Sequence, residues 1–499
     1  MNLGQARTRL VQGGVALASA ALIAGCGSTY RPVVTPVTPS GPAAQPSSFA
    51  VVVSAPSTTT AGIATIIDYS GDSVLALAPI GPGPLTFTID ETGSTGYTLN
   101  SDKTLSNFPI STTLQAKNVE YTTLPSTAQP VNLFSPSAGL LAADLYGNAT
   151  DVFTGFPQAY KQAIQVQTTP VMIVGSSLLS QRFFAISQGN VASGVTCNTA
   201  PATAPNGEVD GIEQSTYTVS PNISVGKCPV FGLETPDYRR LFILNRGDDT
   251  ISVINSQDNT LNQCTPFQNQ NGQTVYCHPT LPLSLNAVKA TGITPPNGTS
   301  GMTATAGPIY AEYNSTTSQL VVSNYDGSTI SVIDVSMDEY GNDSSTFGAT
   351  YTIPVGNNPA AVTVLADGSR AYTANQTDET VTIVNLSSHT VEKTVPTTGH
   401  PRTVVSTQNS QYGKVYVASP DSPYLTILRT DQDIVDTTVL VEGNIVDVRT
   451  TTQNGVSGSG NAEVVSRRPG YGQPCYLPPS VEPAPTGTQT ALDVCRTLP

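Results

Sequence analysis

The sequence predicts an all-β fold built from repeated, four-stranded antiparallel units, and three observations support that prediction. Charged residues make up only 11% of the 499 residues, tryptophan is absent, and Gly and Pro number 42 and 39. That composition is typical of all-β proteins with many polar turns. A Pro-to-Asn interval of 16 residues recurs along the chain, and short stretches of alternating β-branched residues follow the Asn residues.

The repeated unit is clearest in two segments that align without a gap, Val225–Asn245 and Val355–Asn375. In both, Gly precedes Pro by three residues, and the same Pro-to-Asn interval recurs in Pro84–Asn100 and Pro308–Asn324. Polar turns then lead into stretches such as Ile-Ser-Val-Ile, which favour strands. One unit therefore contains four short strands in about 45 residues, which is the size of a β-propeller blade.

Weaker copies complete the ring. They begin at Pro130, Pro170 and Pro401. Together with the four units above, they make seven. An eighth, partial unit lies at residues 63–79, where Asp68 takes the Asn position. The stretch Gly443–Val448 is predicted to supply its inner strand, because closing a ring with strands from both ends removes exposed sheet edges. A literal count thus predicts eight blades, seven complete and one split.

The propeller is predicted to span residues 49–450, with insertions near 190–222 and 257–305 and a Gly/Pro-rich extension at 451–499. Each insertion contains or adjoins a pair of cysteines. Long loops without secondary structure are uncommon in compact domains and are usually functional. We therefore expect the two insertions to carry the surface that recognises a partner.

The first residues predict export and a lipid anchor. Two arginines precede the apolar stretch Val15–Ile23, and two small residues then stand before Cys26. Residues 1–25 have the layout of a signal peptide, and the cysteine that follows resembles a bacterial lipobox. That resemblance implies cleavage before Cys26, lipidation at this residue and a place in the cell envelope. With Gly27 after the cysteine, it implies the outer membrane in a Gram-negative host. Residues 26–48 are Pro-rich and predict an extended tether.

Seven cysteines indicate an oxidising compartment. Apart from Cys26 they form three sequential couples, each flanking a loop rich in Gly, Pro or Asn, and nearest-neighbour pairing is the simplest arrangement. Six cysteines allow fifteen pairings, so the sequence leaves the connectivity open. The couples are Cys197 and Cys228, Cys264 and Cys277, and Cys475 and Cys495.

Four short motifs resemble the YVTN-type β-propeller repeat. They are Tyr372–Asn375, Val415–Ala418, Ile353–Pro359 and Asp367–Tyr372. The resemblance is strong from about residue 223 to 450 and degenerate from 63 to 190. It implies a propeller of seven blades, in tension with the literal count of eight.

Little in the chain predicts chemistry. There is no Gly-x-Ser-x-Gly elbow, no H-E-x-x-H and no C-x-x-C, so neither catalytic residues, nor a metal site, nor a cofactor are predicted. The run Asn206–Glu213 is interpreted as a solvated acidic loop rather than a calcium site. His400 is interpreted as a turn or packing residue. Acids of the blade turns are interpreted as turn formers rather than cation ligands: Asp248, Asp249, Asp326, Asp378 and Glu379.

These observations favour a non-catalytic scaffold over an enzyme. The net charge of −14 argues against a nucleic-acid partner, which needs a basic surface. The anchor, tether and insertions predict a lipoprotein that contacts the membrane through its lipid and binds a protein, glycan or envelope component through its loops. By analogy of fold alone, the alternative is a lactonase-like hydrolase or a metal-related accessory protein that uses the central channel.

Overall fold

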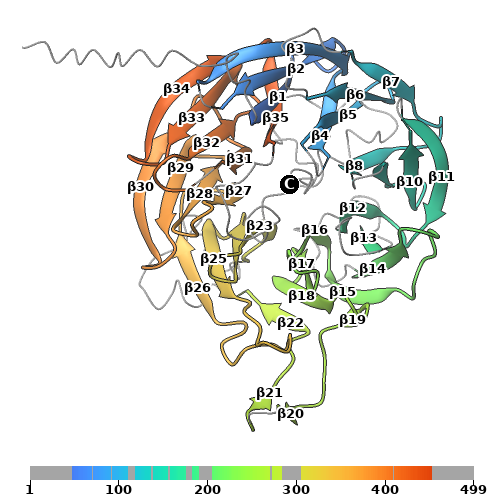
Figure 1. The fold of residues 1–499 in the computed structure, drawn as a ribbon, viewed down its shortest axis with the longest axis vertical. Coiled ribbons are helices and arrows are strands. Elements are labelled where there is room, and N and C mark those ends of the chain that lie inside the picture. Colours follow the sequence, from blue (N-terminus) through green and yellow to red (C-terminus); the bar gives the residue numbers. More distant parts are fainter. Residues whose placement is uncertain are drawn as a thin grey trace, which may run out of the picture. The chain divides into compact units, whose positions relative to one another are not determined.

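Eight four-stranded antiparallel sheets are arranged as blades around a central axis in the computed structural model (Figure 1). The literal count of eight is therefore confirmed, and the seven blades implied by the YVTN resemblance are wrong for this chain. The structure describes residues 48–69, 71–90, 93–110, 118–135, 139–155, 158–175, 182–189, 205–269, 272–283, 305–407 and 409–451.

Each blade runs outward from an inner strand beside the axis, and we name a blade by that strand. The inner strands are β4 (Pro84–Ile89), β8 (Pro130–Phe134), β12 (Pro170–Gly175), β16 (Pro229–Glu234), β23 (Pro308–Asn314), β27 (Pro359–Val364), β31 (Thr403–Ser406) and β35 (Asn444–Thr450). In the same order, the second strands are β5 (Thr95–Asn100), β9 (Leu140–Asp144), β13 (Arg182–Ser187), β17 (Arg240–Asn245), β24 (Gln319–Asn324), β28 (Arg370–Asn375), β32 (Lys414–Ala418) and β1 (Phe49–Ala55).

Two further strands complete each blade. The third strands are β6 (Thr104–Pro109), β10 (Ala149–Thr154), β14 (Asn206–Glu213), β18 (Thr250–Asn255), β25 (Thr329–Asp334), β29 (Thr380–Asn385), β33 (Tyr424–Arg429) and β2 (Ala61–Asp68). The outer strands are β7 (Glu120–Thr123), β11 (Ala159–Gln165), β15 (Ile223–Lys227), β19 (Thr260–Leu261), β26 (Thr350–Pro354), β30 (Thr390–Pro396), β34 (Ile434–Leu440) and β3 (Ser73–Pro82).

The split blade closes the ring as predicted. β35, from the C-terminal end of the propeller, pairs antiparallel with β1, so that Asn444 lies opposite Ala55 and Thr450 opposite Ala50. β2 and β3 complete this sheet. Two details of the prediction need correction. β1 is a strand that the motif search missed, and Asp68 ends the third strand rather than taking the Asn position at the end of the second.

The repeated Pro-to-Asn spacing has a direct structural cause. In the β27 blade, Pro359 and Asn375 are register partners at the start of the inner strand and the end of the second. The Asn375 amide donates to the hydroxyls of Thr380 and Thr382 at 3.0 and 2.8 Å. A Cβ on Gly356 would lie 2.6 Å from the Asn375 Cγ, so only glycine fits there. The same amide contacts recur at three other residues: Asn100, Asn245 and Asn324.

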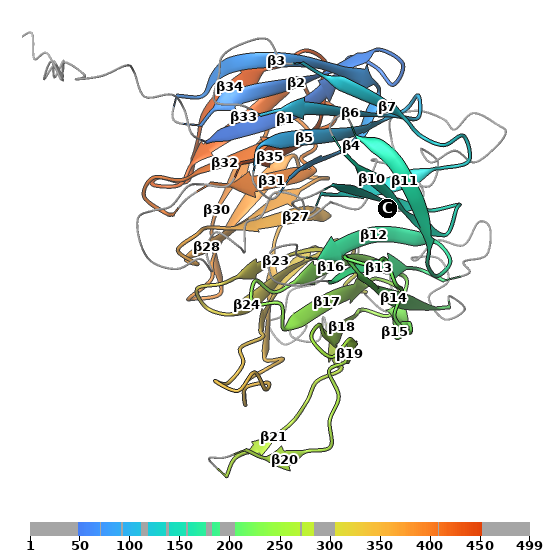
Figure 2. The ribbon, with the colours of Figure 1, turned by 45° about the vertical axis from the view of Figure 1, so that its right-hand side comes forward.

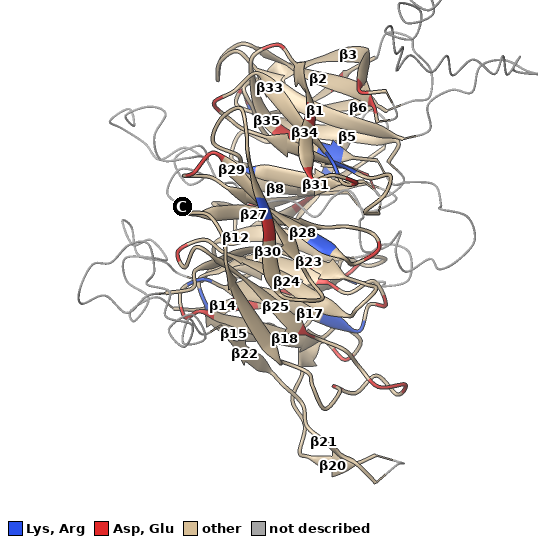
Figure 3. Cartoon of the chain, turned by 90° about the vertical axis from the view of Figure 1, so that its left-hand side faces the viewer, with Lys and Arg blue, Asp and Glu red and all other residues tan. Residues whose placement is uncertain are grey.

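The hydrophobic core lies between neighbouring blades. The inner strand β27 is buried along its whole length, whereas the outer strand β30 of the same blade exposes all but one residue. The β-branched alternation of the third strands supplies apolar side chains to the packed faces, which suits a pleated and largely buried surface. In the view of Figure 3, the charged residues occur at scattered positions on several blades.

The two predicted insertions differ from expectation. Within the first, near 190–222, residues 206–213 form the blade strand β14 and not a loop. The interpretation of Asn206–Glu213 as a solvated acidic loop is wrong, because Asp210 is 1% exposed and its carboxylate accepts the Gln167 N–H at 2.7 Å. Burial raises the pKa of Asp210. The described part of the second insertion, near 257–305, forms an ordered arm.

Several predicted features lie outside the described residues. These are the signal peptide at 1–25, the tether at 26–47, the extension at 452–499, and the cysteines Cys26, Cys197, Cys475 and Cys495. Of the predicted disulfides, Cys264–Cys277 is confirmed, with a Cα–Cα distance of 5.5 Å. Cys228 is also disulfide-bonded. Within the described residues, no helix is long and apolar enough to span a membrane.

Candidate functional site

The arm, residues 262–279, leaves the β16 blade after β19 and returns as β22 (Thr280–Pro282), which pairs with β18. It carries a short hairpin in which β20 (Phe267–Gln268) pairs with β21 (Thr274–Val275). The Cys264–Cys277 disulfide joins the two sides of the arm below this hairpin. Figures 1 and 2 show β20 and β21 projecting beyond the ring.

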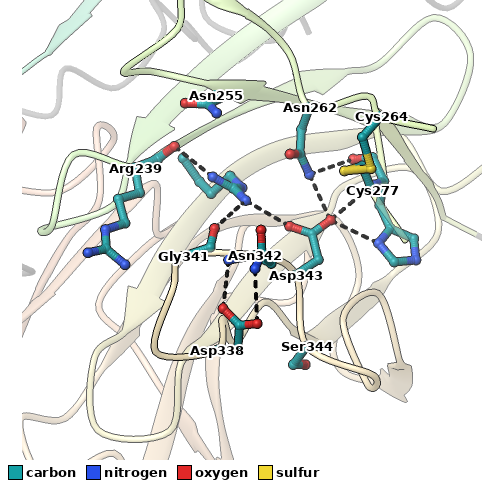
Figure 4. A network of polar contacts seen from close by, with 12 residues as sticks. Arg239, Asn255, Asn262, Cys264, Cys277, Asp338, Gly341, Asn342, Asp343 and Ser344 are labelled. Carbon is teal, nitrogen blue, oxygen red and sulfur yellow. Dashed lines mark hydrogen bonds and ion pairs between the residues drawn. A yellow bond between two sulfur atoms is a disulfide. The ribbon is translucent and has the colours of Figure 1, made fainter. Parts of the chain in front are cut away.

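A buried carboxylate fixes the arm to the propeller. The Asp343 side chain is 0% exposed and lies in the loop between β25 and β26. Its Oδ1 accepts from Arg240 Nη2 at 3.0 Å, and its Oδ2 accepts from Asn262 Nδ2 at 2.7 Å. The His278 backbone N–H donates to the same Oδ2 at 2.9 Å, and His278 Nδ1 lies 3.0 Å from it (Figure 4). Asn262 and His278 stand at the two ends of the arm, so Asp343 holds both.

Arg240 compensates the charge of this carboxylate. It begins β17, its side chain is 5% exposed, and it also donates to the Gly341 carbonyl at 2.9 Å. Removing one partner of a buried ion pair leaves an uncompensated charge and costs about 3 to 5 kcal/mol. The disulfide therefore closes the arm, and hydrogen bonds from Asn262 and His278 fix it to a carboxylate whose own ion pair is expensive to break.

His278 places an imidazole ring at the base of the arm. The imidazole stacks on Phe347 with ring centres 5.2 Å apart, and a third of its side chain stays exposed. A carboxylate on Nδ1 orients an imidazole both in general-base catalysis and in metal ligation. Among the described residues, no three or more His, Cys, Asp or Glu side chains are placed to hold a metal ion. The arrangement thus orients the ring and anchors the arm.

The arm and its anchor loop expose aromatic side chains. Phe267 is 41% exposed and Tyr276 is 58% exposed, and Tyr340 in the anchor loop is 49% exposed. Aromatic residues are enriched where proteins bind one another, because they bury a large area for few frozen torsions. An ordered hairpin with exposed aromatic side chains can dock against a partner with little loss of conformational entropy.

The turn acids bind neighbouring groups in the structure. Asp248 accepts the Lys227 N–H at 3.0 Å, and Asp378 accepts the Asn357 N–H at 2.7 Å. Asp249 accepts the Gly307 N–H of the next blade at 2.7 Å, and burial raises its pKa. Asp326 pairs with Arg246 at 2.7 Å. These contacts agree with their interpretation as turn residues.

His400 also lies at a turn between blades. Its Nδ1 is 2.6 Å from Asp421 and its Nε2 is 3.5 Å from Glu379, and all three side chains are at least one-third exposed. The hydrogen bond to Asp421 raises the pKa of His400. This contact links two neighbouring turns and supports the structural interpretation of the residue.

Sequence reasoning missed Arg240, Asp343 and His278 as a group. They are separated by up to 103 residues and belong to no repeated motif. The available signals were local: Arg240 precedes the apolar run Leu241–Leu244, and Asp343 lies in a loop of mostly polar residues. Only the folded ring brings them together.

No family model matches the sequence, and no curated protein matches it. Among solved structures, apo AztD from Citrobacter koseri is similar with a TM-score of 0.53 at 10% identity, covering 81% of this chain and 97% of that chain. NirN, a dihydro-heme d1 dehydrogenase in complex with DHE, has a TM-score of 0.53 at 13% identity, covering 80% of this chain and 74% of that chain. A putative 6-phosphogluconolactonase from Bacteroides fragilis NCTC 9343 has a TM-score of 0.49 at 15% identity, covering 82% and 99%.

At these identities the similarity to AztD and NirN is one of fold. It agrees with the β-propeller fold described above. Activity does not follow from it, because one fold hosts many unrelated functions. The resemblance to YVTN repeats stays a prediction.

Proposed function

We propose that this protein is a non-catalytic scaffold of the cell envelope, anchored by a lipid on Cys26, that binds a partner protein through the arm. The observation that carries the proposal is the arm itself. It is closed by the Cys264–Cys277 disulfide and held by Asp343, and it exposes Phe267 and Tyr276. A surface fixed in this way loses little conformational entropy on binding.

A protein partner fits these side chains better than a small molecule does. A projecting hairpin offers a convex surface, whereas small-molecule sites are concave and enclose most of the ligand. β20 and β21 form a two-stranded sheet, so each strand has one edge whose carbonyl and N–H groups can pair with a partner's backbone. Aromatic side chains flanking such edges suit a partner surface that buries them in pockets.

The test is a pull-down from crosslinked cells of the host, with the full chain as bait. The arm variant carries Phe267→Ser and Tyr276→Ser. The matched control carries Tyr412→Ser, a residue 73% exposed on the turn before β32. We expect one envelope protein to be recovered with wild type and control but not with the arm variant.

Equal recovery with the arm variant would overturn the arm as the binding surface. Recovery of a glycan in place of a protein would overturn the partner class. A Cys26→Ser variant tests the anchor separately: we expect it to lose radiolabelled palmitate and to leave the membrane fraction. Retention of the label would refute lipidation at Cys26.

A further inference from the structure

The residue after the first Pro of the inner strand is apolar in six blades and is an arginine in the β31 blade. Six inner strands begin with Pro, and in each the ladder to the second strand skips the next residue, which is a β-bulge. The skipped residue is apolar in all six: Leu85, Val131, Val171, Val230, Ile309 and Ala360. In the β31 blade the residue after the corresponding Pro401 is Arg402.

Arg402 is buried without a partner for its charge. It is 5% exposed, and its Nε is buried with no hydrogen bond. Only its backbone N–H is bonded, to the Ala418 carbonyl at 2.9 Å. Within the described part of the chain its guanidinium takes part in no hydrogen bond or salt bridge.

The nearest charges come from β35, the inner strand of the adjacent blade. Burial lowers the pKa of Arg402, Asp447 acts to raise it, and Arg449 acts to lower it. Asp447 already has a partner, because Arg449 Nη2 lies 3.0 Å from its Oδ2 and Arg449 Nε donates to the same oxygen at 3.1 Å. The two charges of β35 therefore act on Arg402 in opposite directions, and the Asp447 carboxylate is bonded to Arg449 and not to Arg402.

A third inner strand, β23, approaches Arg449. Tyr310 on β23 is 7% exposed and lies near Arg449 and near the carboxylate of Glu312. Burial is the main reason why the pKa of Tyr310 is raised, so its hydroxyl keeps its proton. Arg402, directly before β31, thus lies near Arg449 on β35, and Arg449 in turn lies near the neutral phenol of Tyr310 on β23. Two carboxylates accompany them, those of Asp447 and Glu312.

An isolated buried guanidinium is costly, and it does not escape the cost by losing its proton. A planar guanidinium with free N–H groups matches the two oxygens of a carboxylate or phosphate. We propose that Arg402, between inner strands β31 and β35, binds the oxyanion group of a small ligand, with Arg449 as a second cation of the site. This site is separate from the arm and does not depend on the arm's function.

The test is calorimetric titration of the purified full chain with sodium phosphate and, separately, with sodium acetate at constant ionic strength. We expect saturable binding of at least one oxyanion, at one site per chain. Preference for phosphate assigns a phosphorylated ligand and preference for acetate assigns a carboxylic acid. The Arg402→Gln variant should bind at least about tenfold more weakly, a change of about 1.4 kcal/mol. The matched control is Arg429→Gln, a change at an exposed arginine paired with Asp431.

Two outcomes would overturn the proposal: no saturable binding of either oxyanion to wild type, or unchanged binding by Arg402→Gln. Melting curves supply a second readout that does not depend on a titration. In anion-free buffer, Arg402→Met should melt above wild type, because an unpaired buried charge is removed, and the bound oxyanion should no longer raise its melting temperature. An Arg402→Met variant that melts below wild type would show that the guanidinium has a protein partner, against the proposal. The Phe267→Ser, Tyr276→Ser variant should bind the oxyanion as wild type does.

Discussion

Replacing Asp151 tests how the repeat tolerates a carboxylate pair. In the β8 blade, Asp144 is the register partner of Pro130 and so takes the Asn position of the other blades. Asp144 lies opposite Ala149, just as Asn245 lies opposite Thr250. Asp151 lies two residues after Ala149, and Ser252 lies two residues after Thr250, so Asp151 takes the position that Ser252 has in the β16 blade. A neutral amide-to-hydroxyl hydrogen bond is therefore replaced by two carboxyl groups.

The Asp151 carboxyl is poorly satisfied. The residue is 2% exposed, and its Oδ2 is buried without a hydrogen-bond partner. Burial first, and the charge of Asp144 second, raise the pKa of Asp151 from 3.8 to about 7. Because the folded protein holds this proton more tightly than the unfolded chain, the free energy of unfolding falls as the pH rises from about 4 to about 7.

The size of the effect follows from the two pKa values. At 1.36 kcal/mol per pH unit, the interval between 3.8 and about 7 corresponds to about 4 kcal/mol. Water penetration and local relaxation reduce such buried-charge penalties, so we expect about 2 to 4 kcal/mol. The Asp151→Asn variant removes the charge at every pH. It should therefore be more stable than wild type by that amount at pH 8, and nearly equal to it at pH 4.

The assay is urea unfolding at pH 4, 5, 6, 7 and 8, followed by circular dichroism, with melting curves at the same pH values. Asp436→Asn, at an exposed position of β34, is the matched control and should show no pH-dependent gain. A gain for Asp151→Asn that is the same at pH 4 and pH 8 would refute the reasoning. A loss of stability at pH 8 would show that the carboxylate has a favourable partner.

Three further predictions concern the arm and the repeat. Asp343→Ala leaves Arg240 buried and unpaired, and we expect a loss of about 3 to 5 kcal/mol in urea unfolding, with Glu339→Ala at an exposed position of the same loop as control. Cys264→Ser opens a loop of 13 residues; on the chain-entropy model it costs about 3 kcal/mol, and we expect faster proteolysis within the arm and unchanged proteolysis of the blades. Gly356→Ala places a Cβ 2.6 Å from the Asn375 Cγ, and we expect a melting temperature lowered by an overpacking cost of about 1 to 3 kcal/mol, whereas Gly71→Ala, whose Cβ would meet its nearest atom at 3.6 Å, should cost less.

Sequence reasoning predicted the blades because each repeat carries its own contacts. The Pro359 and Asn375 pair, the Gly356 beneath it and the Thr380 that follows are all within one blade. A local spacing therefore reports a local geometry. Where the motif is absent, the prediction of strands failed. β1 has neither the Pro nor the Asn of the repeat, and it was not predicted although its seven residues are all buried.

The candidate site was predictable only in part. The Cys264–Cys277 couple marked the second insertion and its disulfide, because the two cysteines are near neighbours in sequence. The anchor was not predictable, since Asp343 meets Arg240 across 103 residues and Asn262 across 81. Arg402 was visible in the sequence next to Pro401, but its burial and its approach to Asp447 and Arg449 on β35 arise only in the folded ring.

The two buried charges that break the repeat have different consequences. Asp151 can relieve its cost by taking up a proton, because burial brings its pKa to about 7. The resulting neutral carboxyl is a structural defect with a pH dependence, and it needs no ligand. Arg402 has no such escape, since a guanidinium keeps its charge even where burial lowers its pKa. Of the two departures, only Arg402 therefore requires an anion from outside the described blades, and this is why the oxyanion site is assigned to it and not to the carboxyl pair.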